Sequence, residues 1–240
     1  MSDYLNTLLF TVYPYVALAI MIIGSILRYD REPYTWRSGS SQLLRRKQLM
    51  WGSVLFHIGI LFLFLGHSVG LLTPHSVYEH FITAEAKQLL AIVAGSIAGV
   101  LCFIGLTMLI HRRFFDPRIR VTSTFADNAI LVILWVQLAL GLITVPYSLQ
   151  HEDANVMLAL SEWAQRILTL RIEGTAELVA AQAWPYQAHI LLGLTIFLIF
   201  PFSRLVHMFS APIRYVWRPG YQVVRERNRR AQQTRLPAGE

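Results

Sequence analysis

The sequence has little charge and almost no cysteine. Charged side chains make up 15% of its 240 residues, whereas a soluble domain normally carries about 25%. Together with an apolar fraction of 55%, this deficit indicates that much of the surface faces lipid. The one cysteine, Cys102, excludes an internal disulfide and a cysteine-ligated iron–sulfur cluster. We expect it to be a small, buried apolar side chain.

A single basic surface is absent as well. The net charge of +7 would by itself be compatible with a nucleic-acid-binding protein. The lysines and arginines instead flank long apolar runs, which is the pattern of a membrane protein. We therefore expect a lipid bilayer as the surroundings of the chain, and no nucleic acid as a partner.

Five apolar runs are long enough to cross a bilayer. A hydrocarbon core of about 30 Å requires roughly 20 residues of helix. The runs that qualify are residues 5–27, 49–72, 89–110, 128–145 and 186–209. The sequence therefore predicts an all-α integral membrane bundle of five transmembrane helices within residues 1–210, followed by a basic tail, residues 211–240.

The basic residues lie almost entirely on one side of these spans. Of the 21 lysines and arginines, only Lys87, Arg166 and Arg171 fall on the other side. Because cytoplasmic loops are enriched in these residues, we expect the N-terminus outside and the C-terminus in the cytoplasm. The long outer loop, residues 148–184, contains a stretch with helical apolar spacing. Both a position on the membrane surface and a position capping the bundle are compatible with it.

Four of the eight histidines lie within predicted spans, His57 and His67 in the second and His189 and His207 in the fifth. An ionisable side chain in a span is costly and usually has a partner. Taken singly, each is compatible with a histidine hydrogen-bonded between helices. Since the two spans are antiparallel, His57 and His207 lie nearer the cytoplasm, and His67 and His189 nearer the outside. Two histidines at one depth on facing helices can bind a haem iron from both sides, so we predict two b-type haems.

The spacing along each span sets a further expectation. His189 and His207 are eighteen residues apart, which is five turns of a continuous helix, so we expect them on one helix face. Gly59, Gly66 and Gly193 lie near the histidines, and we expect these small residues to leave room for the macrocycles.

Lys87 is the single basic residue at the outer edge of the second and third spans. It is compatible with an interfacial lysine that reaches toward the headgroups, or with a hydrogen-bond donor to a quinone oxygen beside the outer haem. His75, His80 and His151 lie in outer loops, where a proton acceptor and a plain surface residue both remain open.

Several motifs, spread in order along the chain, are shared with one known family. They are Leu27-Arg28-Tyr29-Asp30, Tyr34-Thr35-Trp36-Arg37, Phe56-His57-Ile58-Gly59-Ile60-Leu61, Gly66-His67, Leu72-Thr73-Pro74-His75, Lys87-Gln88, Gly99-Val100-Leu101-Cys102, Leu140-Gly141-Leu142, Phe200-Pro201-Phe202-Ser203-Arg204-Leu205 and His207. On these motifs the chain resembles the gamma subunit of membrane-bound respiratory nitrate reductase, the quinol-oxidising dihaem cytochrome b. The outer loop and the longer arginine-rich tail depart from the family.

The resemblance implies roles for individual residues. His57 and His207 would ligate the inner haem, His67 and His189 the outer haem, and Lys87 would bind quinol. Electrons would pass from quinol at the outer side to a cytoplasmic iron–sulfur beta subunit and on to a molybdenum-containing alpha subunit, with protons released outside. The chain would lie in the cytoplasmic (inner) membrane of a bacterium or an archaeon.

Two other interpretations remain open at this point. One is a dihaem quinol cytochrome of a different reductase, such as one for sulfur compounds, which copurifying subunits would identify. The other is a transporter or structural membrane protein without haem, whose histidines hydrogen-bond between helices and which would be colourless.

Overall fold

The computed structural model describes residues 3–37, 46–150 and 153–210. Within them, five helices are long and apolar enough to cross a membrane, which confirms the predicted number: Asp3–Arg31, Gln48–Leu72, Ala84–Phe115, Phe125–Leu149 and Trp184–Phe202. The chain divides after His207 into two compact units, Met1–His207 and Met208–Glu240. The predicted basic tail, residues 211–240, lies outside the described residues.

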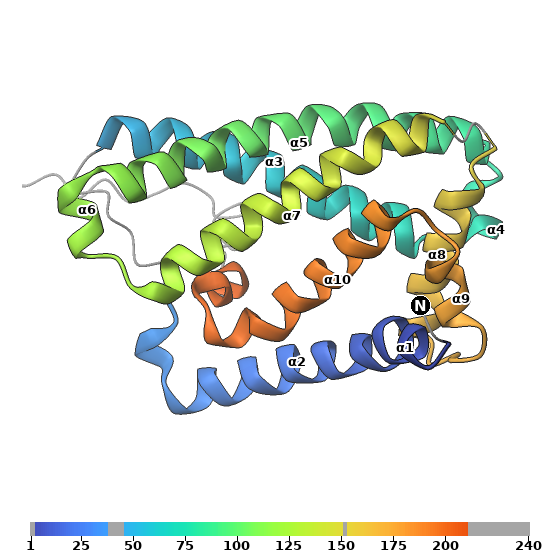
Figure 1. Ribbon diagram of the computed structural model, residues 1–240, viewed down its shortest axis with the longest axis horizontal. Helices are drawn as coiled ribbons and strands as arrows, with labels where there is room; N and C mark the ends of the chain where they lie inside the picture. The colour runs from blue at the N-terminus through green and yellow to red at the C-terminus, as the bar shows by residue number, and fades with distance from the viewer. Residues whose placement is uncertain (1–2, 38–45, 151–152, 211–240) are drawn as a thin grey trace, which may run out of the picture. The chain divides into compact units, whose positions relative to one another are not determined.

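The long helices pack side by side in the order α3, α5, α7, α10 and α2 (Figure 1). Their bounds are α3 (Arg46–Leu72), α5 (Ala84–Phe115), α7 (Phe125–Leu149), α10 (Trp184–Ile199) and α2 (Tyr13–Arg31). Shorter elements are α1 (Asp3–Thr7), η1 (Leu8–Val12), η2 (Pro33–Thr35), α4 (His75–Tyr78), α6 (Pro117–Val121), α8 (Asn155–Leu168), α9 (Thr175–Ala180), η3 (Phe200–Phe202) and η4 (Arg204–Ser210).

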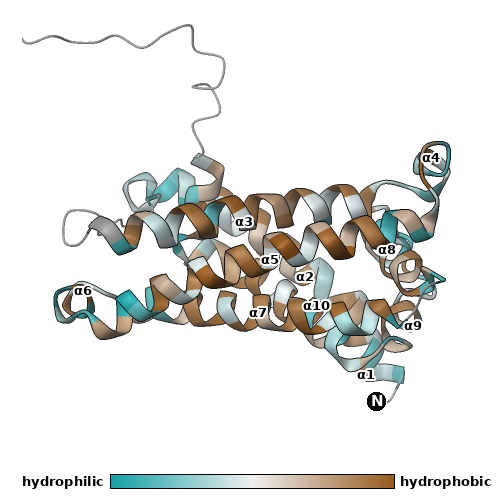
Figure 2. Cartoon of the chain, turned by 90° about the horizontal axis from the view of Figure 1, so that it is seen from above, coloured by the Kyte–Doolittle hydropathy of each residue, from teal (hydrophilic) through white to brown (hydrophobic). Residues whose placement is uncertain are grey.

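The two ends of this bundle differ in character. Figure 2 shows hydrophobic residues along the middle of the long helices and hydrophilic segments at both ends. Apolar side chains in the middle are exposed, for example Phe62 at 66% and Ile97 at 61%, as expected where lipid replaces water. We call the end beside α6 the arginine-rich end, after Arg28, Arg112, Arg113 and Arg204, and the end with α4, α8 and α9 the loop end.

Glycines bring α3 and α5 unusually close together. A Cβ at Gly105 would lie 2.4 Å from the backbone nitrogen of Phe56, and one at Gly59 would lie 2.7 Å from the carbonyl of Ala98. Cys102 is fully buried in this interface, and its Sγ donates to the Phe56 carbonyl at 3.6 Å, so the prediction of a buried thiol is confirmed. The prediction that Gly59 makes room for a macrocycle is wrong, because Gly59 lies against α5 and allows α3 and α5 to pack closely.

Pro14 shapes the first span. It has no N–H to donate to the Phe10 carbonyl, and the chain here forms the π-turn η1. The indole Nε1 of Trp163, on α8, donates to that carbonyl at 2.8 Å. A buried carbonyl that proline leaves short of a donor is thereby satisfied from another element.

Helix α8 also closes the end of α3. Gln165 Nε2 donates to the carbonyl of Leu71 at 2.9 Å, which is one of the last carbonyls of α3 and has no helical partner of its own. Trp163 and Ile167 are buried in a cluster with Phe10. The sequence left two placements open for this part of the outer loop, and the structure packs it on the bundle.

The fifth span is not one continuous helix, so the expectation that His189 and His207 share one helix face is wrong. Helix α10 ends at Ile199, and His207 lies in the 3-10 segment η4. Pro201 is the physical reason, because it lacks a backbone N–H and its ring clashes with a continuing helix. His189 therefore lies on an α-helix and His207 on a 3-10 segment.

Arg28 forms hydrogen bonds to the segment in which the helix of the fifth span ends. Its Nη1 donates to the carbonyls of Pro201 and Ser203, at 2.7 and 2.8 Å. Gly24, one turn earlier on α2, lies directly against the Pro201 ring, where a Cβ would come within 2.8 Å of it. The end of α2 thus holds the segment that leads to His207.

Candidate functional site

The four predicted histidines share one hydrogen-bonding arrangement. In each ring Nδ1 faces a backbone carbonyl: Ser53 for His57 at 2.7 Å, Leu63 for His67 at 2.8 Å, Gln137 for His189 at 3.2 Å and Arg204 for His207 at 2.5 Å. A carbonyl accepts only, so Nδ1 must carry the proton and donate. The lone pair is then on Nε2, which is the nitrogen that can bind a metal. In His189 this nitrogen accepts a long hydrogen bond from the Gln137 side-chain amide, at 3.4 Å.

His67 and His189 face each other across the loop-end half of the bundle. Their ring centroids lie 6.2 Å apart, with the ring planes 37° from parallel. Metal–imidazole bonds of about 2 Å, each extended by about 1 Å to the ring centre, place two axial imidazoles about 6 Å apart. The spacing between these two rings therefore suits a shared metal ion between them.

The surroundings on α3 leave space for a large flat group. His57 and His67 are exposed, and a Cβ added to Gly66 would meet no atom within 4 Å. Among the described residues, Nε2 of His57, of His67 and of His207 has no hydrogen-bond partner. These observations agree with a haem held by the histidine nitrogens.

Helix α7 positions His189 in a way that the sequence did not reveal. Besides accepting from His189 Nδ1, Gln137 donates through its side-chain Nε2 to the His189 carbonyl at 3.0 Å. A Cβ at Gly141 would lie 3.0 Å from His189 Cε1, so only glycine leaves the ring its full space. Gly193 packs against the Gln137 amide, where a Cβ would lie 3.2 Å from Nε2, and not beside a macrocycle as predicted. In the sequence, the one sign of this role of Gln137 was the presence of a glutamine in the middle of an otherwise apolar run.

At the arginine-rich end, charged residues surround the chain before His207. The carboxylate of Asp127 accepts from Arg204 Nε at 2.8 Å and lies 3.2 Å from Nη2 of Arg113. Asp127 also closes a capping box with Thr124 at the start of α7. The carbonyl of Arg204 is the acceptor for His207, so this ion pair connects α7 to the histidine.

Lys87 lies in the first turn of α5, which Thr83 caps by accepting from the Ala86 N–H at 3.3 Å. Its Nζ is buried, has no hydrogen-bond partner among the described residues, and lies 3.6 Å from the centroid of the Tyr78 ring. An interfacial lysine would extend this group toward water. The observed position instead favours a ligand-binding role, and Tyr78 was not singled out from the sequence.

The remaining histidines have more ordinary surroundings. His75 Nδ1 lies 3.0 Å from Glu79 Oε2 on the exposed α4 turn, and His111 Nδ1 accepts a hydrogen bond from Gln48 Nε2 at 3.3 Å. His151 lies outside the described residues. In the described part of the chain, no three histidine, cysteine or carboxylate side chains gather into a metal site.

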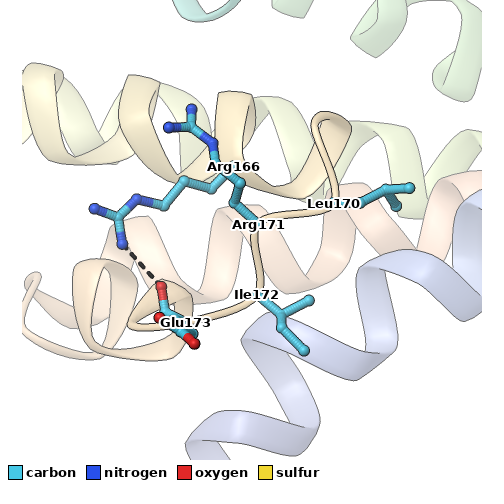
Figure 3. Close-up of a pocket in the computed structure, with 5 residues that line it drawn as sticks. All are labelled: Arg166, Leu170, Arg171, Ile172 and Glu173. Carbon is cyan, nitrogen blue, oxygen red and sulfur yellow. Dashed lines mark hydrogen bonds between the residues drawn. The ribbon is translucent and has the colours of Figure 1, made fainter.

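A shallow groove on the loop end carries none of these residues. It is lined by Arg166, Leu170, Arg171, Ile172 and Glu173 (Figure 3). The guanidinium of Arg166 is already engaged, with Glu162 at 2.6 Å and with the Glu173 carbonyl at 2.8 Å. Its charge is therefore compensated within the protein, and neither Lys87 nor any of the four predicted histidines lines the groove.

The chain is similar to known proteins along most of its length. A family model described as nitrate reductase gamma subunit matches residues 6–227. The respiratory nitrate reductase 1 gamma chain of Escherichia coli (strain K12) is 49% identical over 226 residues, which cover 94% of this chain and 100% of that relative. The respiratory nitrate reductase 2 gamma chain of the same organism is 48% identical over 227 residues, covering 95% and 100%. The nitrate reductase gamma chain of Bacillus subtilis (strain 168) is 35% identical over 222 residues, covering 92% and 98%.

Proposed function

The chain belongs to the nitrate reductase gamma subunit family, and on this basis we propose how its residues serve electron transfer from quinol. It is the quinol-oxidising cytochrome b subunit of a respiratory nitrate reductase and a multi-pass protein of the cytoplasmic membrane. The assignment of ligands, the number of haems, the orientation and the partner subunits are our proposals.

Two haem b groups are bound by pairs of histidines, His67 with His189 and His57 with His207. The 6.2 Å between the rings of His67 and His189 supports the first pair. The second pair comprises the two histidines that remain, which share the same Nδ1 arrangement. Haem b held by these histidines would supply one-electron redox chemistry at each site. The carbonyl acceptors fix the orientation of each imidazole and make its Nε2 a better donor to the iron.

Lys87 binds the quinol at the loop end. Its buried ammonium donates a hydrogen bond to a quinol oxygen and favours loss of the proton from that oxygen. Oxidation of one quinol releases two electrons and two protons, and the protons leave at the loop end. An electron that moves toward the cytoplasm against a potential of 100 mV stores about 2.3 kcal/mol.

The arginine-rich end faces the cytoplasm, with the N-terminus outside. Arg28, Arg112, Arg113 and Arg204 at one end of the spans support this orientation through the positive-inside rule. The partners on this side are an iron–sulfur beta subunit, which takes the electrons, and a molybdenum-containing alpha subunit, which reduces nitrate. The family name, a gamma subunit of nitrate reductase, supports a multisubunit complex of this kind.

The observation that carries the ligand assignment is the common orientation of the four rings, each with Nδ1 on a carbonyl. It is tested by a reduced-minus-oxidised optical spectrum of the purified complex, with haem b quantified per gamma chain. We expect two haems in the unaltered protein and one in each of the single variants H57A, H67A, H189A and H207A.

His111→Ala serves as the matched control, because that ring interacts with a side-chain amide and not with a carbonyl. It should retain both haems. A folded but colourless protein from haem-replete cells would restore the interpretation in which the histidines only hydrogen-bond between helices. Two haems retained in any of the four variants would remove that histidine from the ligand set.

A further inference from the structure

Tyr78 is a buried tyrosine whose hydroxyl has no partner in the described part of the chain. Only 8% of the residue is exposed, although it lies on the short helix α4 in the connection between α3 and α5. A buried hydroxyl without a hydrogen bond costs free energy, so each such group calls for an explanation. By comparison, the hydroxyl of Tyr186 forms a hydrogen bond with the Ser148 hydroxyl at 2.7 Å.

Another polar group without a hydrogen-bond partner lies against the face of the Tyr78 ring. Lys87 Nζ is 3.6 Å from the Tyr78 ring centroid, so the ammonium lies over the aromatic face, within a few ångströms of the hydroxyl. Lysine can only donate, and a phenol can donate or accept. Two such groups side by side match a ligand with an oxygen atom, since each hydrogen bond spans about 2.8 Å.

Burial, with smaller contributions from Glu79 and Glu85, raises the pKa of Tyr78 above its ordinary value. The hydroxyl therefore keeps its proton at physiological pH and remains available as a donor.

The packing register of α3 and α5 shows where this pair lies relative to His67. Gln48 contacts His111, and Gly59 lies between Ala98 and Cys102, so the two helices run antiparallel in a fixed register. Continued to the loop end, this register places Lys87 level with the end of α3, five residues beyond His67. That distance is about 7.5 Å along the helix axis, which is on the order of the width of a quinone ring.

We propose that Tyr78 is a second quinol-binding residue, which holds the Lys87 ammonium on its ring face and hydrogen-bonds through its hydroxyl to the same quinol oxygen. This rests on the proposed quinol site at Lys87. Tyr78 thus contributes to the affinity and placement of the quinol and not to haem binding.

The test uses the complete membrane-bound complex with tetramethylhydroquinone as the electron donor and nitrate as the acceptor. Tyr78→Phe keeps the ring under Lys87 and removes only the hydroxyl. We expect kcat/KM for the quinol to fall about tenfold, the loss that corresponds to one hydrogen bond to a bound ligand. Both haems and nitrate reduction by a dye that donates directly to the soluble subunits should be unchanged.

Tyr13→Phe is the matched control, because it removes a part-buried hydroxyl that already has a protein partner, Thr195 at 2.9 Å. It should leave kcat/KM unchanged. Unaltered kinetics in Tyr78→Phe, with a strong defect in Lys87→Ala, would overturn the role of Tyr78 and leave the quinol site standing. Unaltered kinetics in Lys87→Ala would move the quinol site elsewhere and overturn both. In the double variant Tyr78→Phe/Lys87→Ala, the loss of kcat/KM should be no greater than in Lys87→Ala alone if both groups hold one quinol oxygen. Losses that add fully would contradict a shared oxygen.

Discussion

The two proposed haem ligand pairs are supported by different kinds of structure. At the loop end, His67 and His189 lie on regular helices, and a third helix, α7, places Gln137 and Gly141 against the His189 ring. At the arginine-rich end, His207 lies on a 3-10 segment, where the ion pair of Arg204 with Asp127 adds to the packing of the buried Leu205 and Val206.

This difference follows from Pro201. At His189, the hydrogen bonds of helix α10 itself fix the backbone. The neighbouring helix α7 needs only a small residue, Gly141, to leave space for the His189 ring. Where the helix breaks, the released carbonyls need donors from elsewhere, and Arg28 donates to those of Pro201 and Ser203. Arg204 holds the same segment to α7 through the carboxylate of Asp127. The two ends should therefore respond to different substitutions, and each can be disturbed separately.

The largest effect is expected from Arg28→Ala. It removes two charge-assisted hydrogen bonds to the carbonyls of Pro201 and Ser203, each worth about 1.5–3 kcal/mol. We expect loss of most of the inner haem with the outer haem retained, measured as haem per chain and by the two separate redox transitions of an optical titration. Arg31→Ala, an exposed neighbour on the same helix, is the control and should retain both. Equal loss of both haems would show that Arg28 supports the whole bundle and not one end.

A smaller effect, confined to the other end, is expected from Gly141→Val. The new side chain enters the space of His189 Cε1, 3.0 Å from a Cβ at this position, and overpacking of this kind costs about 1–3 kcal/mol. On mild heating, the outer haem should be released before the inner haem. The release is measured as the change in haem absorbance with temperature. Gly95→Val is the matched control, since no atom lies within 4 Å of a Cβ there. If the inner haem were released first, the assignment of His189 to the outer site would be wrong.

The smallest effect is expected from Gln137→Leu. This change removes both side-chain hydrogen bonds of Gln137 Nε2, one to the His189 carbonyl at 3.0 Å and one to His189 Nε2 at 3.4 Å. A metal on Nε2 would replace the longer bond, and the backbone acceptor of His189 Nδ1 stays in place, so the cost is about 1 kcal/mol. Both haems should remain bound, and only the thermal midpoint for release of the outer haem should fall. A full loss of the outer haem would mean that the Gln137 side chain, and not its carbonyl, sets the ring orientation.

Much of the fold could be predicted because the bilayer imposes it. A run of about 20 apolar residues has few structural options other than a helix in lipid, since its backbone must satisfy its own hydrogen bonds. The number of spans was therefore predicted correctly, although the fifth ends at Phe202 and not at residue 209. Cys102 was correctly expected to be buried. The spacing argument failed at His207, because a count of residues assumes a continuous helix and Pro201 ends it.

The sequence by itself determined the number of spans, the uneven distribution of basic residues and the presence of four histidines in two of the apolar runs, since these depend on composition along the chain. The tertiary structure decided which groups meet. It brought the rings of His67 and His189 to 6.2 Å, set the Gln137 carbonyl against His189, packed α8 on the end of α3, and placed Tyr78 under Lys87. Such contacts join residues that are distant in the chain, and they depend on how the helices rotate and approach one another. Side-chain packing settles that geometry, and no local pattern in the sequence records it.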